Sequence, residues 1–174
     1  MLTLEWTNFV HFGGAGLLTK SSISAIRALI YLGYSKTELP LSALAVARQL
    51  RESPSYLSKI LRRMVRYGLL EVVHGASGGF RLSRRPDRIN LFEIVEACQG
   101  VVTGDACPRE DLALACGFHQ ASVELRDAVT EVLSRWTLAD CMGRPAKCSG
   151  RDARVCRASV TLPSQSTRKS RRMA

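Results

Sequence analysis

The fold is decided by residues 53–100, which read SPSYLSKILRRMVRYGLLEVVHGASGGFRLSRRPDRINLFEIVEACQG. The stretch opens with Ser53 and Pro54, which are typical of a helix N-cap and of the first helical position. Apolar side chains then recur at the spacing i, i+3, i+4, i+7, which predicts a helix over residues 54–67 with one buried face. The residues of this face are Leu57, Ile60, Leu61 and Met64.

A β-hairpin is expected directly after this helix. Residues 69–73 (LLEVV) are typical of a strand, residues 74–79 (HGASGG) of a turn, and residues 80–83 (FRLS) alternate apolar and polar as a half-buried strand should. Asn90 is then expected to cap a short helix that ends near Cys98.

Two helices are expected before this stretch. The first runs over residues 19–33 with Gly33 as its C-cap, and the second is opened by Pro40 and Ser42. Three helices followed by a hairpin are typical of a winged helix-turn-helix domain. The predicted fold class is therefore mostly α with a small β-hairpin wing, in which the helix over residues 54–67 is the recognition helix.

A long helix is expected to follow this domain, from about Gln120 to Asp140. Its apolar stripe extends from Leu125 to Trp136 at helical spacing, which is longer than one small domain needs and therefore favours dimerisation. The sequence thus divides into an N-terminal extension (1–17), a winged helix-turn-helix DNA-binding domain (18–100), a cysteine loop (101–119), a dimerisation helix (120–141) and a basic disordered tail (142–174).

The positive charge is concentrated in two blocks. The chain has a net charge of +10, of which residues 142–174 carry +8 and residues 48–88 carry +7, whereas the remainder carries −5. Such asymmetry indicates a polyanionic partner, and nucleic acid is the usual one. A charge distribution that only keeps the protein soluble is the alternative.

Several classes of protein are disfavoured by the sequence. No apolar run approaches the roughly 18 residues that a membrane span needs, and the N-terminal residues do not have the pattern of a signal peptide. We therefore expect a cytoplasmic protein that makes no membrane contact. The sequence contains no phosphate-binding loop, nucleophile elbow or paired-carboxylate motif, so we expect no enzymatic activity.

The predicted recognition helix and wing supply the candidate contacts to double-stranded DNA. A recognition helix needs an apolar face for docking, polar side chains for base edges and cations for phosphates. A solvated basic face or a protein-interaction module would explain the same pattern. The candidates are Ser55, Tyr56, Ser58 and Lys59 for the bases, Arg62, Arg63 and Arg66 for the phosphates, and Ser77, Gly78 and Arg81 in the wing.

The sequence motifs of this region resemble the Rrf family of bacterial winged helix-turn-helix regulators. The resemblance covers about residues 17–142 and implies a transcription regulator that binds DNA as a homodimer, which we expect to be a repressor. His74 stands where the family has a wing arginine, and it is carried over as a DNA-contacting candidate. The matching residues are Tyr56-Leu57, Ile60, Gly68-Leu69, Gly75, Gly78-Gly79-Phe80, Leu82, Pro86, Ile89 and Gly100.

The resemblance also implies a sensor that uses cysteines. Iron–sulfur members of the family carry three cysteines before the dimerisation helix, and here Cys107, Cys116 and His119 match part of that set. Cys98 is the candidate for the missing ligand of an iron–sulfur cluster. Zinc is the rival metal for a mixed Cys/His set, and a loop without metal next to a buried Cys98 is the third alternative. The alternative function is a cofactor-free regulator that responds to a protein partner or to direct thiol oxidation.

Overall fold

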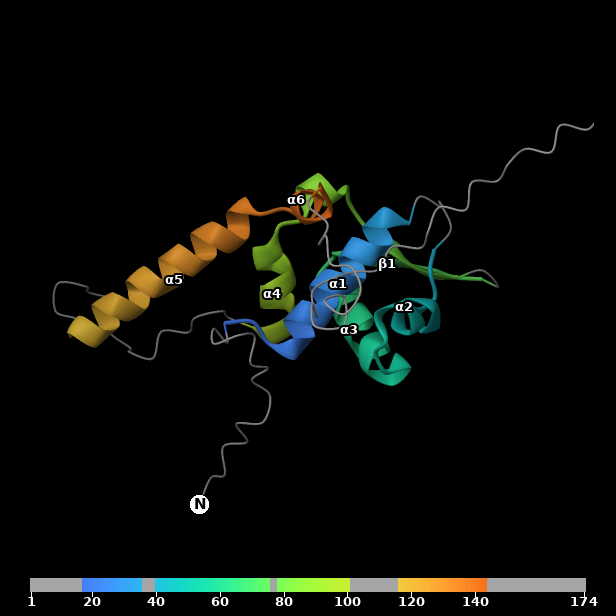
Figure 1. Ribbon diagram of the computed structural model, residues 1–174, viewed down its shortest axis with the longest axis horizontal. Coiled ribbons are helices and arrows are strands. Elements are labelled where there is room, and N and C mark those ends of the chain that lie inside the picture. Colours follow the sequence, from blue (N-terminus) through green and yellow to red (C-terminus); the bar gives the residue numbers. More distant parts are fainter. Residues whose placement is uncertain (1–16, 36–39, 76–77, 101–115, 144–174) are drawn as a thin grey trace, which may run out of the picture.

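The computed structural model describes residues 17–35, 40–75, 78–100 and 116–143. The expected N-terminal extension, most of the cysteine loop and nearly all of the basic tail lie outside these residues. The protein is mostly helical with a two-stranded antiparallel sheet, as the sequence predicts (Figure 1). Its elements are α1 (Lys20–Tyr34), α2 (Ala43–Leu50), α3 (Pro54–Arg66), β1 (Leu70–Val73), β2 (Gly79–Leu82), the 3₁₀ turn η1 (Pro86–Arg88), α4 (Leu91–Gln99), α5 (Gly117–Arg135) and α6 (Leu138–Gly143).

Polar N-caps fix where the helices of the winged helix-turn-helix begin. The side chains of Thr19, Ser42, Ser53 and Asn90 each accept a hydrogen bond from a backbone N–H in the first turn of α1, α2, α3 and α4, respectively. Each bond satisfies a donor that the first helical turn would otherwise leave unpaired. The helix starts predicted from the sequence at Ser42, Ser53 and Asn90 are confirmed.

The wing is attached to the helical domain by one extra pairing. In the hairpin, Leu70 lies opposite Leu82 and Val73 lies opposite Gly79. On the other edge of β2, Phe80 donates to the carbonyl of Leu41 at 2.9 Å and accepts from the N–H of Leu41 at 3.1 Å. The residue that precedes α2 therefore holds the wing beside the helix-turn-helix.

The end of α1 differs from the prediction. The helix continues past Gly33 to Tyr34, and Ser35 is its C-cap. Gly33 is inside the helix, where a Cβ atom would lie 2.7 Å from the sulfur of Met142 in α6. The glycine therefore permits the close approach of another helix instead of ending its own.

The helix expected from Gln120 to Asp140 is two helices in the structure. Trp136 is extended (φ −87°, ψ 123°) and ends α5. Thr137 and Asp140 then start α6, since the Thr137 hydroxyl accepts from the Asp140 N–H at 3.2 Å and the Asp140 carboxylate accepts from the Thr137 N–H at 2.9 Å. This reciprocal arrangement is a capping box.

The break between α5 and α6 returns the chain to the DNA-binding domain. Leu91 donates to the carbonyl of Trp136 at 2.9 Å, and Leu138 donates to the carbonyl of Ile89 at 2.8 Å. The side chain of Leu138 is fully buried. In Figure 1, α5 extends away from the other helices and α6 lies against them. No helix within the described ranges has the length and apolarity that a membrane span requires.

The wing attachment predicts a strong effect at one glycine. A Cβ atom at position 79 would lie 2.5 Å from the carbonyl carbon and oxygen of Leu41, which are backbone atoms that cannot move independently. We expect Gly79→Ala to lower the free energy of unfolding by about 1–3 kcal/mol. Gly117→Ala is the matched control, because a Cβ there meets no atom within 4 Å. Urea denaturation measures both variants, and equal stabilities would contradict the wing geometry.

Candidate nucleic-acid interface

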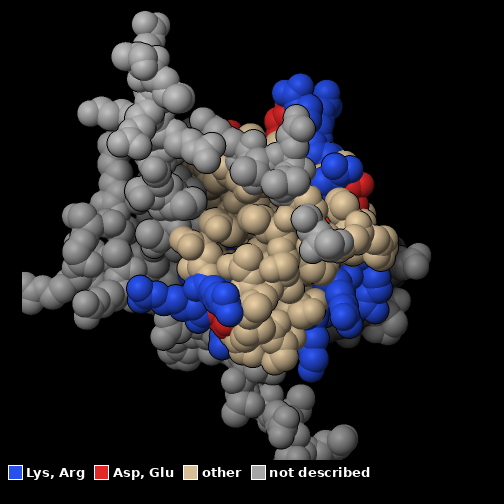
Figure 2. Space-filling view, turned by 90° about the vertical axis from the view of Figure 1, so that its right-hand side faces the viewer, with Lys and Arg blue, Asp and Glu red and all other residues tan. Residues whose placement is uncertain are grey.

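Cations mark one face of the molecule. Figure 2 shows Lys and Arg side chains standing out from a largely uncharged surface in several groups, with few acidic side chains among them. Among the residues of α3 in particular, Lys59, Arg62 and Arg66 are exposed. A helix with this charge is suited to a polyanion such as the DNA backbone.

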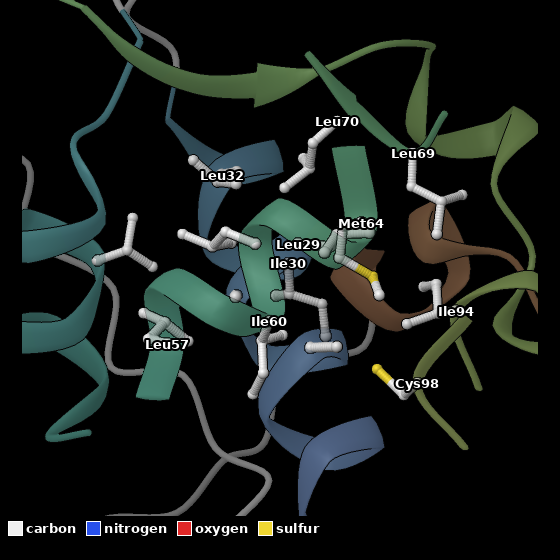
Figure 3. Close-up of a cluster of buried hydrophobic side chains, with 14 of the residues drawn as sticks. Leu29, Ile30, Leu32, Leu57, Ile60, Met64, Leu69, Leu70, Ile94 and Cys98 are labelled. Atoms are coloured by element: carbon white, nitrogen blue, oxygen red, sulfur yellow. The ribbon is translucent and has the colours of Figure 1, made fainter. Parts of the chain in front are cut away.

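The opposite face of α3 is buried in the core. Leu57, Leu61 and Met64 are fully buried and Ile60 is 6% exposed. Figure 3 shows Leu57, Ile60 and Met64 among side chains of α1, of the residues around β1 and of α4, and Leu61 belongs to the same cluster. The apolar stripe read from the sequence is confirmed, and it determines which side of α3 faces outward.

Tyr56 is only partly directed outward. Its side chain is half-buried and packs against the core, and its hydroxyl lies 3.4 Å from that of Ser21 in α1. The ammonium of Lys20 lies 5.3 Å from the centre of the Tyr56 ring, which is a cation–π distance. Tyr56 therefore joins the first turn of α3 to the first turn of α1. Its neighbours Ser55 and Ser58 are exposed and half-buried, respectively.

Arg63 lies apart from the other arginines of α3. It is half-buried, whereas Arg62 and Arg66 are exposed. Its positive charge acts on Cys98 in α4, where it favours the thiolate. The helical pattern alone placed Arg63 with Arg62 and Arg66, since it does not show that α4 packs beside this residue.

The basic side chains of the wing are paired with acids in the free protein. Arg81 forms an ion pair with Glu71, which lies directly opposite it in the hairpin. Both side chains are about half exposed, so the pair adds little stability and can exchange for a phosphate contact. His74 is exposed at the end of β1, Gly78 is half-buried, and Ser77 lies outside the described residues.

Two further arginines flank the wing and are paired as well. Arg84 makes a forked contact to Glu93 in α4, at 3.3 and 3.2 Å. Arg85 contacts Asp87 in η1 at 2.9 Å. These pairs orient the loop after β2 without burying it.

The cysteine candidates do not come together within the described part of the chain. Cys98 is buried in the core (Figure 3), and its thiol lies 3.6 Å from the carbonyl of Ser21. Burial raises the pKa of Cys98 to about 11, and the charge of Arg63 opposes this only in part. No group of metal-binding side chains among the described residues includes Cys98, so its role as a ligand stays a prediction.

The other candidate ligands lie at the start of α5. Cys116 is its N-cap and is exposed, His119 is buried, and Cys107 lies outside the described residues. No group of three His, Cys, Asp or Glu side chains among the residues that the structure describes is arranged to hold a metal ion. These residues therefore do not fit a complete iron–sulfur or zinc site on their own.

Several large apolar side chains of α5 are exposed in the part of the chain that the structure describes. Phe118, Leu125 and Val132 are 77%, 53% and 46% exposed. They are seven residues apart, so they lie along one side of the helix. Within α5, which is described throughout, His119 alone is buried. Such a surface is typical of a protein–protein interface.

Comparisons with known proteins agree with this architecture. Residues 18–144 match the model of the Rrf2 family, described as iron-dependent transcriptional regulators. The chain is 33% identical over 134 residues to the protein aau3 of Rhizobium meliloti, with 71% of this chain and 82% of that protein covered. It is 28% identical over 128 residues to the transcriptional regulator NsrR of Shouchella clausii, with 71% and 86% covered.

Two solved structures share the fold of this chain. CymR, described as the global cysteine regulator of B. subtilis, superposes with a TM-score of 0.60 and 27% identity, covering 71% of this chain and 94% of that chain. IscR of T. potens shares the fold with a TM-score of 0.58 at 22% identity. The match to the family model covers well over half of the sequence and includes the helix-turn-helix, the wing and α5. The chain therefore belongs to the Rrf2 family of helix-turn-helix transcriptional regulators.

Proposed function

We propose that this regulator binds specific sequences of double-stranded DNA through α3 and the wing, as a homodimer that represses transcription. The observation that carries this proposal is the orientation of α3. Its apolar face is buried in the core, and the other side presents serines, Lys59, Arg62 and Arg66. A recognition helix needs one apolar face that docks it in the domain and one polar, basic face that contacts DNA. A DNA partner also implies a cytoplasmic location.

The proposed contacts divide by chemistry. Ser55, Ser58 and Lys59 lie in the first half of α3, the part that enters the major groove in helix-turn-helix proteins. Hydroxyl and ammonium groups there can reach base edges, and the half-buried Tyr56 lies beside them. The exposed arginines Arg62 and Arg66 are suited to the flanking phosphates. In the wing, His74, Gly78 and Arg81 are proposed to reach the adjacent groove or backbone.

We propose that α5 forms the dimer. Its exposed apolar side runs from Phe118 through Leu125 to Val132, and pairing it with the same helix of a second copy would bury all three side chains. A two-fold dimer would also present two recognition helices to successive turns of one DNA duplex. The hydrogen bonds between residues 136–138 and 89–91 would transmit the dimer geometry to α3.

For sensing, we propose that the cysteine loop and Cys116 are the responsive element. An iron–sulfur cluster would require Cys107 and a further ligand from outside the described residues, with Cys116 and His119. The second candidate, a cofactor-free regulator controlled by thiol oxidation, is favoured by the exposure of Cys116. Analysis of iron, sulfide and zinc in protein purified without oxygen separates these alternatives. Iron together with sulfide supports the iron–sulfur cluster, and the absence of both supports the cofactor-free regulator controlled by thiol oxidation.

The first prediction concerns base reading. We expect Ser58→Ala and Lys59→Ala to change the preference between operator and mutated operator by about 1–3 kcal/mol per lost base contact. Arg62→Gln and Arg66→Gln should weaken binding to every duplex alike and reduce the salt dependence of binding. Fluorescence anisotropy at several salt concentrations measures both effects. The assignment fails if the Ser58 and Lys59 variants discriminate between duplexes as well as the parent does.

The second prediction concerns assembly. Leu125→Asp should convert the dimer to a monomer at micromolar concentration, because a charge buried in the interface lacks a partner. Ser134→Asp is the control, since it adds the same charge to the same helix at an exposed polar position. Sedimentation should give twice the chain mass of 19.1 kDa for the parent and the control. A dimeric Leu125→Asp variant would contradict the role of α5.

The third prediction concerns thiol reactivity. At pH 8, Cys116 should be alkylated rapidly and Cys98 only after denaturant is added, because burial raises the pKa of Cys98 to about 11 and the thiolate is the nucleophile. Peptide mapping by mass spectrometry follows each cysteine separately. Equal alkylation rates in the folded protein would show that Cys98 is accessible and would contradict its burial in the core.

A further inference from the structure

Two cations from outside α3 flank its N-terminal end. The sequence pattern placed phosphate-binding arginines only in the second half of the helix, and of these Arg63 is half-buried beside Cys98. The structure adds Lys20, from the first turn of α1, and Arg51, from the turn between α2 and α3. Both side chains are exposed.

Lys20 is positioned by a recognition-helix residue. Its ammonium lies 5.3 Å from the centre of the Tyr56 ring, and the adjacent Ser21 hydroxyl lies 3.4 Å from the Tyr56 hydroxyl. The first turn of α1 contains no acidic residue that would neutralise Lys20. The charge of Lys20 therefore lies beside the start of α3, on the α1 side.

Arg51 occupies a backbone conformation that favours glycine. With φ 56° and ψ 42° it is left-handed, and among the described residues it is the only non-glycine with positive φ. This conformation costs an L-residue free energy, and glycine usually fills the corresponding position after a helix. The backbone N–H of Arg51 bonds to the carbonyls of Ala47 and Arg48, which holds the conformation in place.

The next residue anchors the turn and leaves Arg51 pointing to solvent. The Glu52 carboxylate accepts from the Ser24 hydroxyl at 3.0 Å and pairs with Arg27 at 3.5 Å, and both partners belong to α1. The Arg27 and Glu52 side chains are only 16% and 14% exposed. A non-glycine residue in a strained conformation, exposed on a turn that Glu52 anchors to α1, is a reason to look for a function of its side chain.

We propose that Lys20 and Arg51 form a phosphate clamp that grips the DNA backbone at the N-terminal end of α3. This rests on the proposed DNA-binding function and extends it. Arg62 and Arg66 are proposed to contact DNA phosphates near the C-terminal end of α3. With Lys20 and Arg51, cations therefore lie at both ends of this helix. The contacts are to phosphate oxygens, so they add affinity and register without reading sequence.

Substitutions at Arg51 separate the effect of the side-chain charge from the effect of the backbone conformation. Arg51→Gly removes the charge and relieves the left-handed strain, Arg51→Ala removes the charge and keeps the strain, and Arg51→Lys keeps both. We expect Arg51→Gly and Arg51→Ala to weaken operator binding several-fold. In both variants the slope of the logarithm of the binding constant against the logarithm of the salt concentration should become smaller in magnitude by about 0.9. Lys should bind like the parent. The Tm of the Gly variant should equal or exceed that of the Ala variant, so loss of DNA binding follows charge and not stability.

At Lys20, the variant Lys20→Gln removes the positive charge and Lys20→Arg keeps it. Arg135→Gln in α5 is the control, because it removes one positive charge elsewhere in the chain. Lys20→Gln should weaken operator and unrelated duplex alike, and the other two should bind like the parent. Parent-like salt slopes in Arg51→Gly and Lys20→Gln overturn the clamp. A Tm of Arg51→Gly below that of Arg51→Ala assigns Arg51 a structural role and also overturns it. A parent protein that binds no duplex at any salt concentration overturns the DNA-binding function itself.

Discussion

The docking of α3 into the core, through one apolar stripe, is the interaction on which the rest of the structure depends. Leu57, Ile60, Leu61 and Met64 lose nearly all contact with water, and each such side chain contributes about 1.5–3 kcal/mol. Because successive helical residues are about 100° apart, a shift of one position would bury polar side chains and expose apolar ones. The stripe therefore fixes both the stability of the domain and the identity of the outward residues. Folding and DNA recognition are two consequences of one packing arrangement.

The second constraint is the return of the chain after α5. A helix that extends away from its domain cannot fix the position of α3 unless one of its ends is attached to that domain. Here the backbone hydrogen bonds between residues 136–138 and 89–91, together with the buried Leu138, provide that attachment. The contact between Gly33 and Met142 adds a second junction, between α6 and α1. A change at the start of α5, where Cys116 and His119 lie, would thus act on a helix that is tied directly to the DNA-binding domain.

Local patterns in the sequence predict most of this domain, because caps, turns and apolar spacing are determined by neighbouring residues. The starts of α2, α3 and α4 and the hairpin were predictable for this reason. Gly33, the end of α5 and the orientation of Arg63 depend on segments distant in the sequence, namely α6, residues 89–91 and α4. The Lys20–Tyr56 contact also requires the packing of α1 against α3. The periodicity of one helix contains no information about these neighbours.

The most direct measurement of the central claim is selection of binding sites from a library of random DNA duplexes, followed by methylation interference on the enriched sequence. A dimer that reads DNA through two copies of α3 should select a two-fold symmetric motif whose half-sites are one helical turn, about 34–36 Å, apart. Methylation of guanine N7 in the major groove of each half-site should block binding, because α3 occupies that groove. An enriched motif without symmetry, binding that is indifferent to N7 methylation, or no enrichment over the starting library would contradict recognition by paired α3 helices.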